Sequence, residues 1–243
     1  MPQSYQVRKI DRMIKLTLIL SLFISQLLSF ANFQHQLDQI IPDDFPELDI
    51  DIDLERFGVN KNIPDEIREV TLRALSHYPE LLDVKIDFQF QNKIRGSVMQ
   101  AQPKIGSLLF NNKDNRSYRI KISRHLELLD ERVPIEELPH EVLLGWIGHE
   151  LGHIKDYLER SMANMVSFGI RYVLSDRFVT QAEIAADSYS VANGLGEAIV
   201  ATKEFILNHD RLPVTYQDKI RAFYMSPGEI ISMVDVEEEE ENN

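Results

Sequence analysis

The stretch Gly145-Trp146-Ile147-Gly148-His149-Glu150-Leu151-Gly152-His153 decides how the rest of the chain is interpreted. Its two histidines are four residues apart, so on a helix they lie on one face and both imidazoles can reach one metal ion. Glu150 lies about 100° further round the helix, where it borders the metal without binding it. A carboxylate there can accept a proton from water that a metal ion has made more acidic. The stretch therefore predicts a metal site with a base beside it; the competing interpretation is a pair of core or surface histidines.

The surrounding residues predict a mostly buried helix. Apolar side chains recur at mixed three- and four-residue spacings from Val142 to Leu158, and Pro139 suits the first turn. Gly145, Gly148 and Gly152 lie at positions i, i+3 and i+7, and each costs about 1 kcal/mol of helix propensity relative to alanine. Three glycines on one stripe predict that another backbone packs close against that side of the helix.

A third metal ligand is needed, since catalytic zinc sites use three protein ligands and keep a fourth position open. The helix predicted over residues 179–192 carries Glu183 and Asp187 at positions i and i+4, on one face. One carboxylate can bind the metal while the other holds the free nitrogen of a ligating histidine. The alternative is an exposed acidic face. Asp156 is a rival ligand, but with the two histidines it would spread the set about 10 Å along one helix, too far for one ion.

Helical and alternating apolar patterns divide the body of the chain into elements. Around the metal helix, we expect helices over 64–75, 161–174 and 179–192 and strands over 84–90, 97–102 and 118–122. This order predicts an α+β fold. Met99 to Pro103 is expected at the sheet edge facing the metal helix, where an extended peptide can pair with it. The plain alternative is an ordinary edge strand that Pro103 protects.

Composition limits the domain organisation and the partners. The 243 residues, 44% of them hydrophobic, are enough to bury one good core, which is expected over residues 63–235 after an irregular lead-in over 32–62. A net charge of −13 argues against nucleic acid as a partner. Residues 236–243 are expected to be a disordered acidic tail. The chain has no cysteine, which excludes disulfides, thiolate zinc ligands and cysteine nucleophiles.

The N-terminal segment has the pattern of a targeting sequence. Four basic residues between Arg8 and Lys15 precede an uncharged run over residues 16–33 that includes Ser29-Phe30-Ala31. This pattern predicts a signal peptide over residues 1–31, cleaved after Ala31, and export to the periplasm or the outside of the cell. The alternative is an uncleaved membrane anchor formed by residues 16–33.

The two motifs together resemble those of the gluzincin metallopeptidases. The first is His149-Glu150-Leu151-Gly152-His153 and the second is Glu183-Ile184-Ala185-Ala186-Asp187, whose Ala-Asp pair narrows the choice. Within this group the chain is most similar to the branch of the HtpX and CAAX-prenyl proteases and the small soluble minigluzincins. The resemblance covers roughly residues 82–193. It implies a zincin-like fold: a small mixed sheet with an edge strand over the active-site helix, a glutamate helix, and further C-terminal helices.

The resemblance also implies roles for individual residues. His149, His153 and Glu183 would bind one Zn²⁺ per chain, Glu150 would act as general base and acid, and Asp187 would orient a histidine ligand. The implied activity is zinc-dependent hydrolysis of peptide bonds in a peptide or protein substrate.

The group that stabilises the oxyanion is not identified by the resemblance. Residues of suitable type follow the second motif; they are Tyr189, His209, Tyr216 and Arg221. Two alternative functions stay open. One is an exported zinc-binding protein with an idle or latent site that serves as a binding or chaperone-like module, and the other is an interaction domain without metal.

Overall fold

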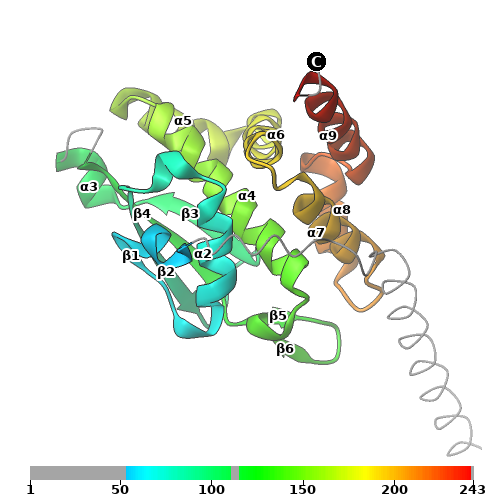
Figure 1. Cartoon of the computed structure of the whole chain (residues 1–243). Coiled ribbons are helices and arrows are strands. Elements are labelled where there is room, and N and C mark those ends of the chain that lie inside the picture. The colour runs from blue at the N-terminus through cyan, green and yellow to red at the C-terminus, as the bar shows by residue number, and fades with distance from the viewer. Residues whose placement is uncertain (1–52, 111–114, 242–243) are drawn as a thin grey trace, which may run out of the picture. The chain divides into compact units, whose positions relative to one another are not determined.

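A small mixed sheet forms from the three alternating runs of the sequence and one short extra strand. The computed structural model describes residues 53–110 and 115–241. In the sheet, β1 (Lys61–Asn62), β2 (Lys85–Gln91) and β4 (Ser117–Ser123) are parallel, and β3 (Met99–Pro103) runs antiparallel to β4. The strand order is β1-β2-β4-β3, which places β3 at one edge (Figure 1).

Helices form most of the remaining described chain. Helix α2 (Arg68–Ser76) lies between β1 and β2 in the chain, α3 (Ile105–Phe110) lies between β3 and β4, and the long helix α4 (His140–Glu159) contains both histidines of the first motif. The helices after α4 are α5 (Met162–Leu174), α6 (Asp176–Ala192), α7 (Gly196–Asn208), α8 (Val214–Phe223) and α9 (Pro227–Glu241). A two-stranded hairpin, β5 (His125–Glu127) with β6 (Arg132–Pro134), and short 3-10 segments complete the described elements. The fold is α+β, as the order of the sequence patterns predicts.

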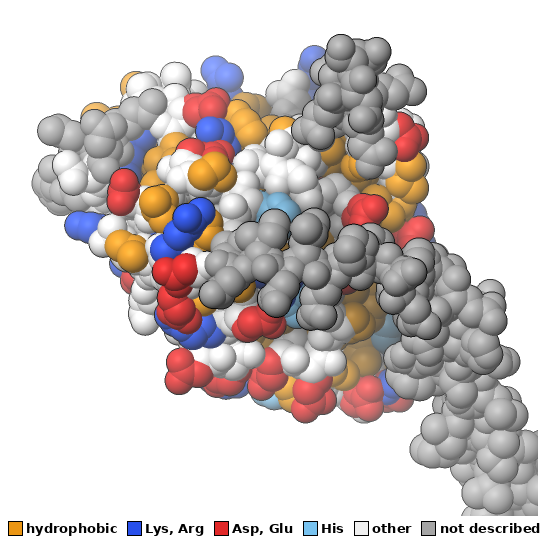
Figure 2. Space-filling view, in the orientation of Figure 1, with side chains coloured by type: hydrophobic (Ala, Val, Ile, Leu, Met, Phe, Trp, Pro, Cys, Tyr) orange, Lys and Arg blue, Asp and Glu red, His pale blue; other side chains and the backbone are white. Residues whose placement is uncertain are grey.

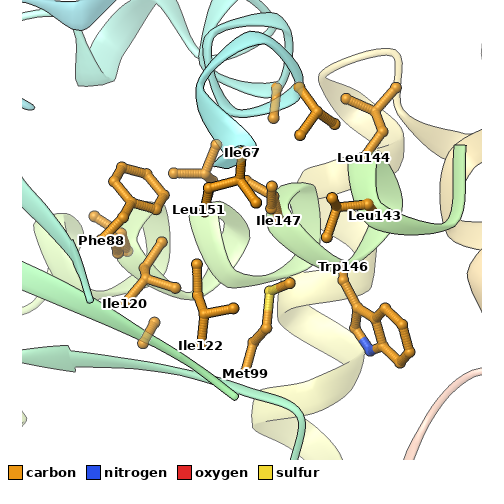
Figure 3. Close-up of a cluster of buried hydrophobic side chains, with 14 of the residues drawn as sticks. Ile67, Phe88, Met99, Ile120, Ile122, Leu143, Leu144, Trp146, Ile147 and Leu151 are labelled. Atoms are coloured by element: carbon orange, nitrogen blue, oxygen red, sulfur yellow. The ribbon is translucent and has the colours of Figure 1, made fainter. Parts of the chain in front are cut away.

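The main core lies between one face of the sheet and helix α4. In the sheet, Phe88 and Ile120 point toward the helix, and Ile147 and Leu151 of α4 point back toward them (Figure 3). These four side chains are at most 2% exposed. Burying a side chain of this size stabilises the folded state by about 1.5–3 kcal/mol, so this contact fixes α4 across the sheet.

The glycine stripe of α4 is where two later helices approach most closely. A Cβ at Gly145 would collide with the carbonyl of Ala198 in α7, and one at Gly152 would collide with the carbonyl of Ala186 in α6. Gly148 faces Leu195. The prediction that another backbone packs against this side is confirmed, because only a residue without a side chain leaves room for these contacts.

The structure corrects both ends of the predicted domain. Residues 53–62 are part of the folded unit: Phe57 is 5% exposed in the core, and β1 pairs with β2. A two-residue strand carries too little periodicity to be seen in the sequence. The prediction of a disordered tail from residue 236 is wrong for 236–241, because α9 continues to Glu241. Glutamate has a good helix propensity, which the charge-based prediction left out.

The predicted signal peptide or anchor lies outside the described residues. Within them, no helix has the combination of length and apolar character needed to cross a bilayer. The face in Figure 2 mixes hydrophobic, basic and acidic side chains, with acidic ones gathered along its lower edge, where Figure 1 places β5 and β6. Asp130 and Glu131, in the turn of that hairpin, are exposed.

Candidate metal centre

Three side chains from two helices converge on one point. His149 and His153 project from α4, and Glu183 projects from α6. Glu183 Oε2 lies 3.0 Å from His149 Nε2 and 3.2 Å from His153 Nε2. One donor atom of each residue lies within 4.8 Å of the other two, and all three residues are buried. Ligands at about 2.0–2.1 Å from a tetrahedral zinc ion are about 3.3 Å apart, so this group fits a metal ion of that size.

Asp187, one turn after Glu183, contacts the other side of the first histidine. Its Oδ1 lies 2.8 Å from His149 Nδ1. Its second oxygen, Oδ2, accepts hydrogen bonds from Lys203 Nζ at 2.7 Å and from the Met225 backbone N–H at 3.3 Å. A carboxylate in this position fixes the ring orientation and the tautomer of a metal-binding imidazole. Nε2 of His149 is thereby presented to the shared point.

Glu183 is held by a residue that the sequence analysis did not single out. The hydroxyl of Tyr172, in α5, donates a hydrogen bond of 2.6 Å to Glu183 Oε1. The second oxygen, Oε2, is the atom that faces both histidines. His153 is oriented differently from His149: its ring stacks on Tyr157 with centroids 6.1 Å apart, and its buried Nδ1 has no hydrogen-bond partner among the described residues.

Glu150 points toward the edge strand. Its Oε2 accepts a hydrogen bond from the backbone N–H of Ala101 in β3. Beside it is a cavity of about 590 Å³ that is bordered by β3, α5, Glu150, His153 and Glu183. The apolar and aromatic part of its lining comes from Met99, Ala101, Pro103, Tyr157, Met165, Phe168, Tyr172, Val179, Phe223 and Tyr224. The candidate base, two of the candidate metal ligands and the sheet edge therefore open into the same space.

Burial and the neighbouring charges shift several pKa values in this group. Burial alone would lower the pKa of His149, but Asp187 and Glu183 together raise it to about 10. Burial acts to raise the pKa of Glu183, yet the two histidines hold it well below its usual range. For Glu150 burial dominates and raises the pKa. Without a metal, the group is thus an ion pair between a protonated His149 and two carboxylates.

Lys203 and Asp187 form a second buried pair behind the ligands. Burial lowers the pKa of Lys203 against the opposing effect of Asp187. Burial also acts to raise the pKa of Asp187, but His149 and Lys203 lower it below the ordinary value. The carboxylate of Asp187 is therefore ionised at neutral pH.

The structure separates the four residues considered for the oxyanion. Tyr216 lies near Glu150: the two residues line the same small cavity of about 30 Å³, together with Trp146. The others point elsewhere: Tyr189 donates to Glu159, His209 Nδ1 accepts from the Arg211 backbone N–H, and Arg221 pairs with Asp218. None of these three lines either described cavity.

The rival ligand Asp156 also has another partner. Its carboxylate forms two hydrogen bonds, of 2.8 and 2.9 Å, with the guanidinium of Arg160. It contributes no atom to the group of three candidate ligands.

Several residues that contact the candidate ligands were not predicted from the sequence, and Tyr157, which stacks on His153, is one of them. Tyr172, Lys203 and Tyr224 contact Glu183, Asp187 and the His149 ring, respectively, the last with centroids 5.5 Å apart. Tyr172 precedes Glu183 by 11 residues, but helical periodicity does not relate the two positions, because α5 ends and α6 begins between them. One signal in the sequence could have identified Lys203. Helical periodicity places this lysine on the apolar side of residues 196–208, where a charged side chain is unusual.

Comparison with known proteins identifies no relative: no family model, no curated protein and no solved structure matches this chain.

Proposed function

We propose that this protein is a zinc-dependent endopeptidase with a zincin-like fold of the gluzincin type. The observation that carries the proposal is the convergence of His149, His153 and Glu183 on one point, with the Glu150 carboxylate hydrogen-bonded to the neighbouring edge strand. Two imidazoles and one carboxylate form a ligand set that suits zinc and leaves a fourth position for a reactant.

The chemistry divides between the ion and the chain. A zinc ion held by these ligands supplies a Lewis acid that polarises a carbonyl and lowers the pKa of water toward neutrality. Glu150 accepts the proton of the attacking water and afterwards gives it to the leaving amine. Its raised pKa supports this role, because a base works best when its pKa lies near the operating pH. The hydrogen bond from Ala101 keeps the carboxylate in place between the two transfers.

The edge strand and the cavity support a polypeptide substrate. Among the described residues, β3 pairs with β4 on one side only. An extended peptide can add to such an edge through backbone hydrogen bonds, which places its backbone beside Glu150. The cavity of about 590 Å³ then accepts a substrate side chain. The apolar and aromatic part of its lining favours a large apolar residue.

Export belongs to the same proposal. The basic and then uncharged N-terminal sequence supports a signal peptide over residues 1–31, which would deliver the enzyme to the periplasm or the outside of the cell. Comparing the N-terminal residue and the location of the mature protein with those of an Ala31→Arg variant tests this part independently of the chemistry.

Glu150→Gln tests the proposed activity. We expect the variant to keep one zinc ion per chain and to lose hydrolysis of a fluorogenic peptide library by on the order of 10²- to 10⁴-fold, since the general base is absent. Glu141→Gln is the matched control, because Glu141 lies in the first turn of the same helix and is exposed. Hydrolysis by Glu150→Gln at the wild-type rate would refute the assignment of the base. Zinc binding by the wild type without hydrolysis of any peptide would instead favour the idle-site alternative.

A further inference from the structure

Lys203 is a buried cation that the chemistry of the proposed reaction does not use. Its side chain is only 5% exposed, and its partner Asp187 is fully buried. Taking an ammonium group out of water costs several kcal/mol unless it is paired and hydrogen-bonded. Burial at this cost indicates that the ammonium group of Lys203 has a specific role at this position.

The contacts of Lys203 lead in one line to the candidate ligands. Its Nζ lies 2.7 Å from Asp187 Oδ2, and Asp187 Oδ1 lies 2.8 Å from His149 Nδ1. Its Nζ also lies 4.4 Å from the centroid of the Tyr224 ring, and that ring packs against the His149 imidazole. Lys203 thus contacts both groups that lie behind the first histidine.

The fold holds Lys203 in this position. The hydroxyl of Thr202, the preceding residue, lies 2.8 Å from the carbonyl oxygen of Val142 and 3.0 Å from that of Ala198, so its single O–H is shared between them and ties α7 to the first turn of α4. The close approach of α7 at Gly145 brings the two helices together along the same stretch. The long lysine chain therefore starts from a fixed backbone, and its ammonium group can hold Asp187 in one orientation.

Two opposite expectations follow for metal binding. If Lys203 acted only through its charge, it would repel a dication at the candidate ligands, and its removal would strengthen metal binding. If it fixes Asp187, its removal lets the carboxylate rotate away from His149 Nδ1, and metal binding weakens. In other metal sites, loss of a group that orients a metal-binding histidine typically lowers the affinity for the metal by about 10- to 100-fold.

We propose that Lys203 is a positioning residue for the metal site: it fixes the Asp187 carboxylate, and Asp187 in turn holds His149 with Nε2 directed at the ion. This inference rests on metal binding at His149, His153 and Glu183 and does not require the peptidase activity. A protein that binds zinc without cleaving peptides would leave it intact.

The experiment compares three substitutions in the full chain by zinc affinity and by the absorption spectrum of the Co²⁺-loaded protein. Lys203→Met removes the donor and is expected to weaken zinc binding by about 10- to 100-fold and to alter the Co²⁺ spectrum. Lys203→Arg keeps charge and donors and is expected to recover most of the affinity. Lys104→Met is the control, because Lys104 pairs with Asp87 on the sheet, outside the metal group. It is expected to bind zinc as the wild type does.

Two results would overturn the proposal. The first is zinc binding by folded Lys203→Met that equals or exceeds that of the wild type, which would leave only the charge effect. If Lys203→Met does not fold, Lys203→Gln replaces it, because glutamine is one bond shorter and does not reach Asp187 Oδ2. Loss of the fold, measured by circular dichroism, in both neutral variants is the second overturning result, since it would make Lys203 a requirement of the whole domain.

Discussion

The backbone N–H of Ala101 donates a hydrogen bond to the carboxylate of Glu150, and this contact joins the edge strand β3 to helix α4 at the candidate base. Ala101 pairs in register with Ile120 of β4, whose side chain is fully buried under α4. The position of the base therefore depends on the same sheet that forms the core. On the proposed function, a peptide that paired with β3 would lie beside Glu150 for the same reason.

Substitution of Glu183 is expected to remove the metal. In Glu183→Ala, the oxygen that faces both histidines is gone, and two imidazoles alone hold zinc weakly. Zinc stoichiometry after gel filtration should fall from one per chain to well below one. Glu204→Ala, an exposed carboxylate of α7, should keep the full complement. Zinc retained at one per chain in Glu183→Ala would show that the third ligand is another residue.

Metal binding is expected to release about one proton at pH 8. The pKa of His149 in the metal-free protein is raised to about 10, so the ring is charged at that pH, and it must lose its Nε2 proton to bind an ion. A histidine with the ordinary pKa of about 6.5 would already be neutral and release almost none. Calorimetric titration with Zn²⁺ in buffers of different ionisation enthalpy measures this number. A value near zero would contradict the charged state of His149.

The same raised pKa predicts how the stability of the metal-free protein depends on pH. A group whose pKa is higher in the folded state stabilises the fold fully below its unfolded pKa, about 6.5 for histidine. That contribution is lost as pH rises through about 10. The urea midpoint of the metal-free protein should therefore fall between about pH 6.5 and 10. In His149→Gln, this part of the decline should be absent.

Filling the cavity is expected to change substrate preference. A Cβ at Gly169 in α5 meets nothing within 4 Å, and Gly169 lines the cavity, so Gly169→Leu adds a side chain at the cavity wall from an unobstructed Cβ position. On the proposed function, kcat/KM should fall about 10-fold or more for peptides with a large apolar residue and much less for those with a small one. Gly106, in α3, also faces open space but lies outside the cavity lining. Gly106→Leu should therefore leave unchanged the ratio of kcat/KM for peptides with a large apolar residue to kcat/KM for peptides with a small one. An unchanged ratio in Gly169→Leu would place the substrate side chain elsewhere.

Adding a methyl group at Gly145 is expected to destabilise the fold. The new Cβ would collide with the backbone carbonyl of Ala198, which has no flexible end that can move aside. Overpacking of this kind costs about 1–3 kcal/mol, more than the gain of about 1 kcal/mol from better helix propensity. Thermal unfolding measures the difference. Gly228→Ala, where a Cβ meets open space, is the control and should not lose stability.

Much of the architecture could be predicted because its signals are periodic. The alternating runs became β2, β3 and β4, and the apolar spacing around His149 became α4. The third ligand was narrowed to Glu183 or Asp187, because the i, i+4 spacing on one helix limits the choice; the structure brings Glu183 Oε2 to the histidines and Asp187 to His149 Nδ1.

The contacts that support the ligands could not be predicted, since they join helices whose relative orientation is set by packing. Lys203 reaches the site because α7 approaches α4 closely at Gly145, and Tyr224 reaches it from the end of α8. A single sequence does not specify either packing distance. The same limit applies to Tyr189, whose position two residues after Asp187 turns it to another side of α6, toward Glu159. The spacing of residues in the sequence determines which face of a helix they share, but not which other element packs against that face.

The three donors to Asp187 lie on His149, Lys203 and Met225, and these residues leave the ribosome in that order. The motif of α4 is therefore synthesised well before the residues that hold its histidine in place. A nascent chain that ends before Met225 carries both histidines, Glu150 and Glu183 but lacks one of the groups that fix them. Completion of the site therefore requires synthesis through Met225, and a chain terminated before that residue would not assemble it in full.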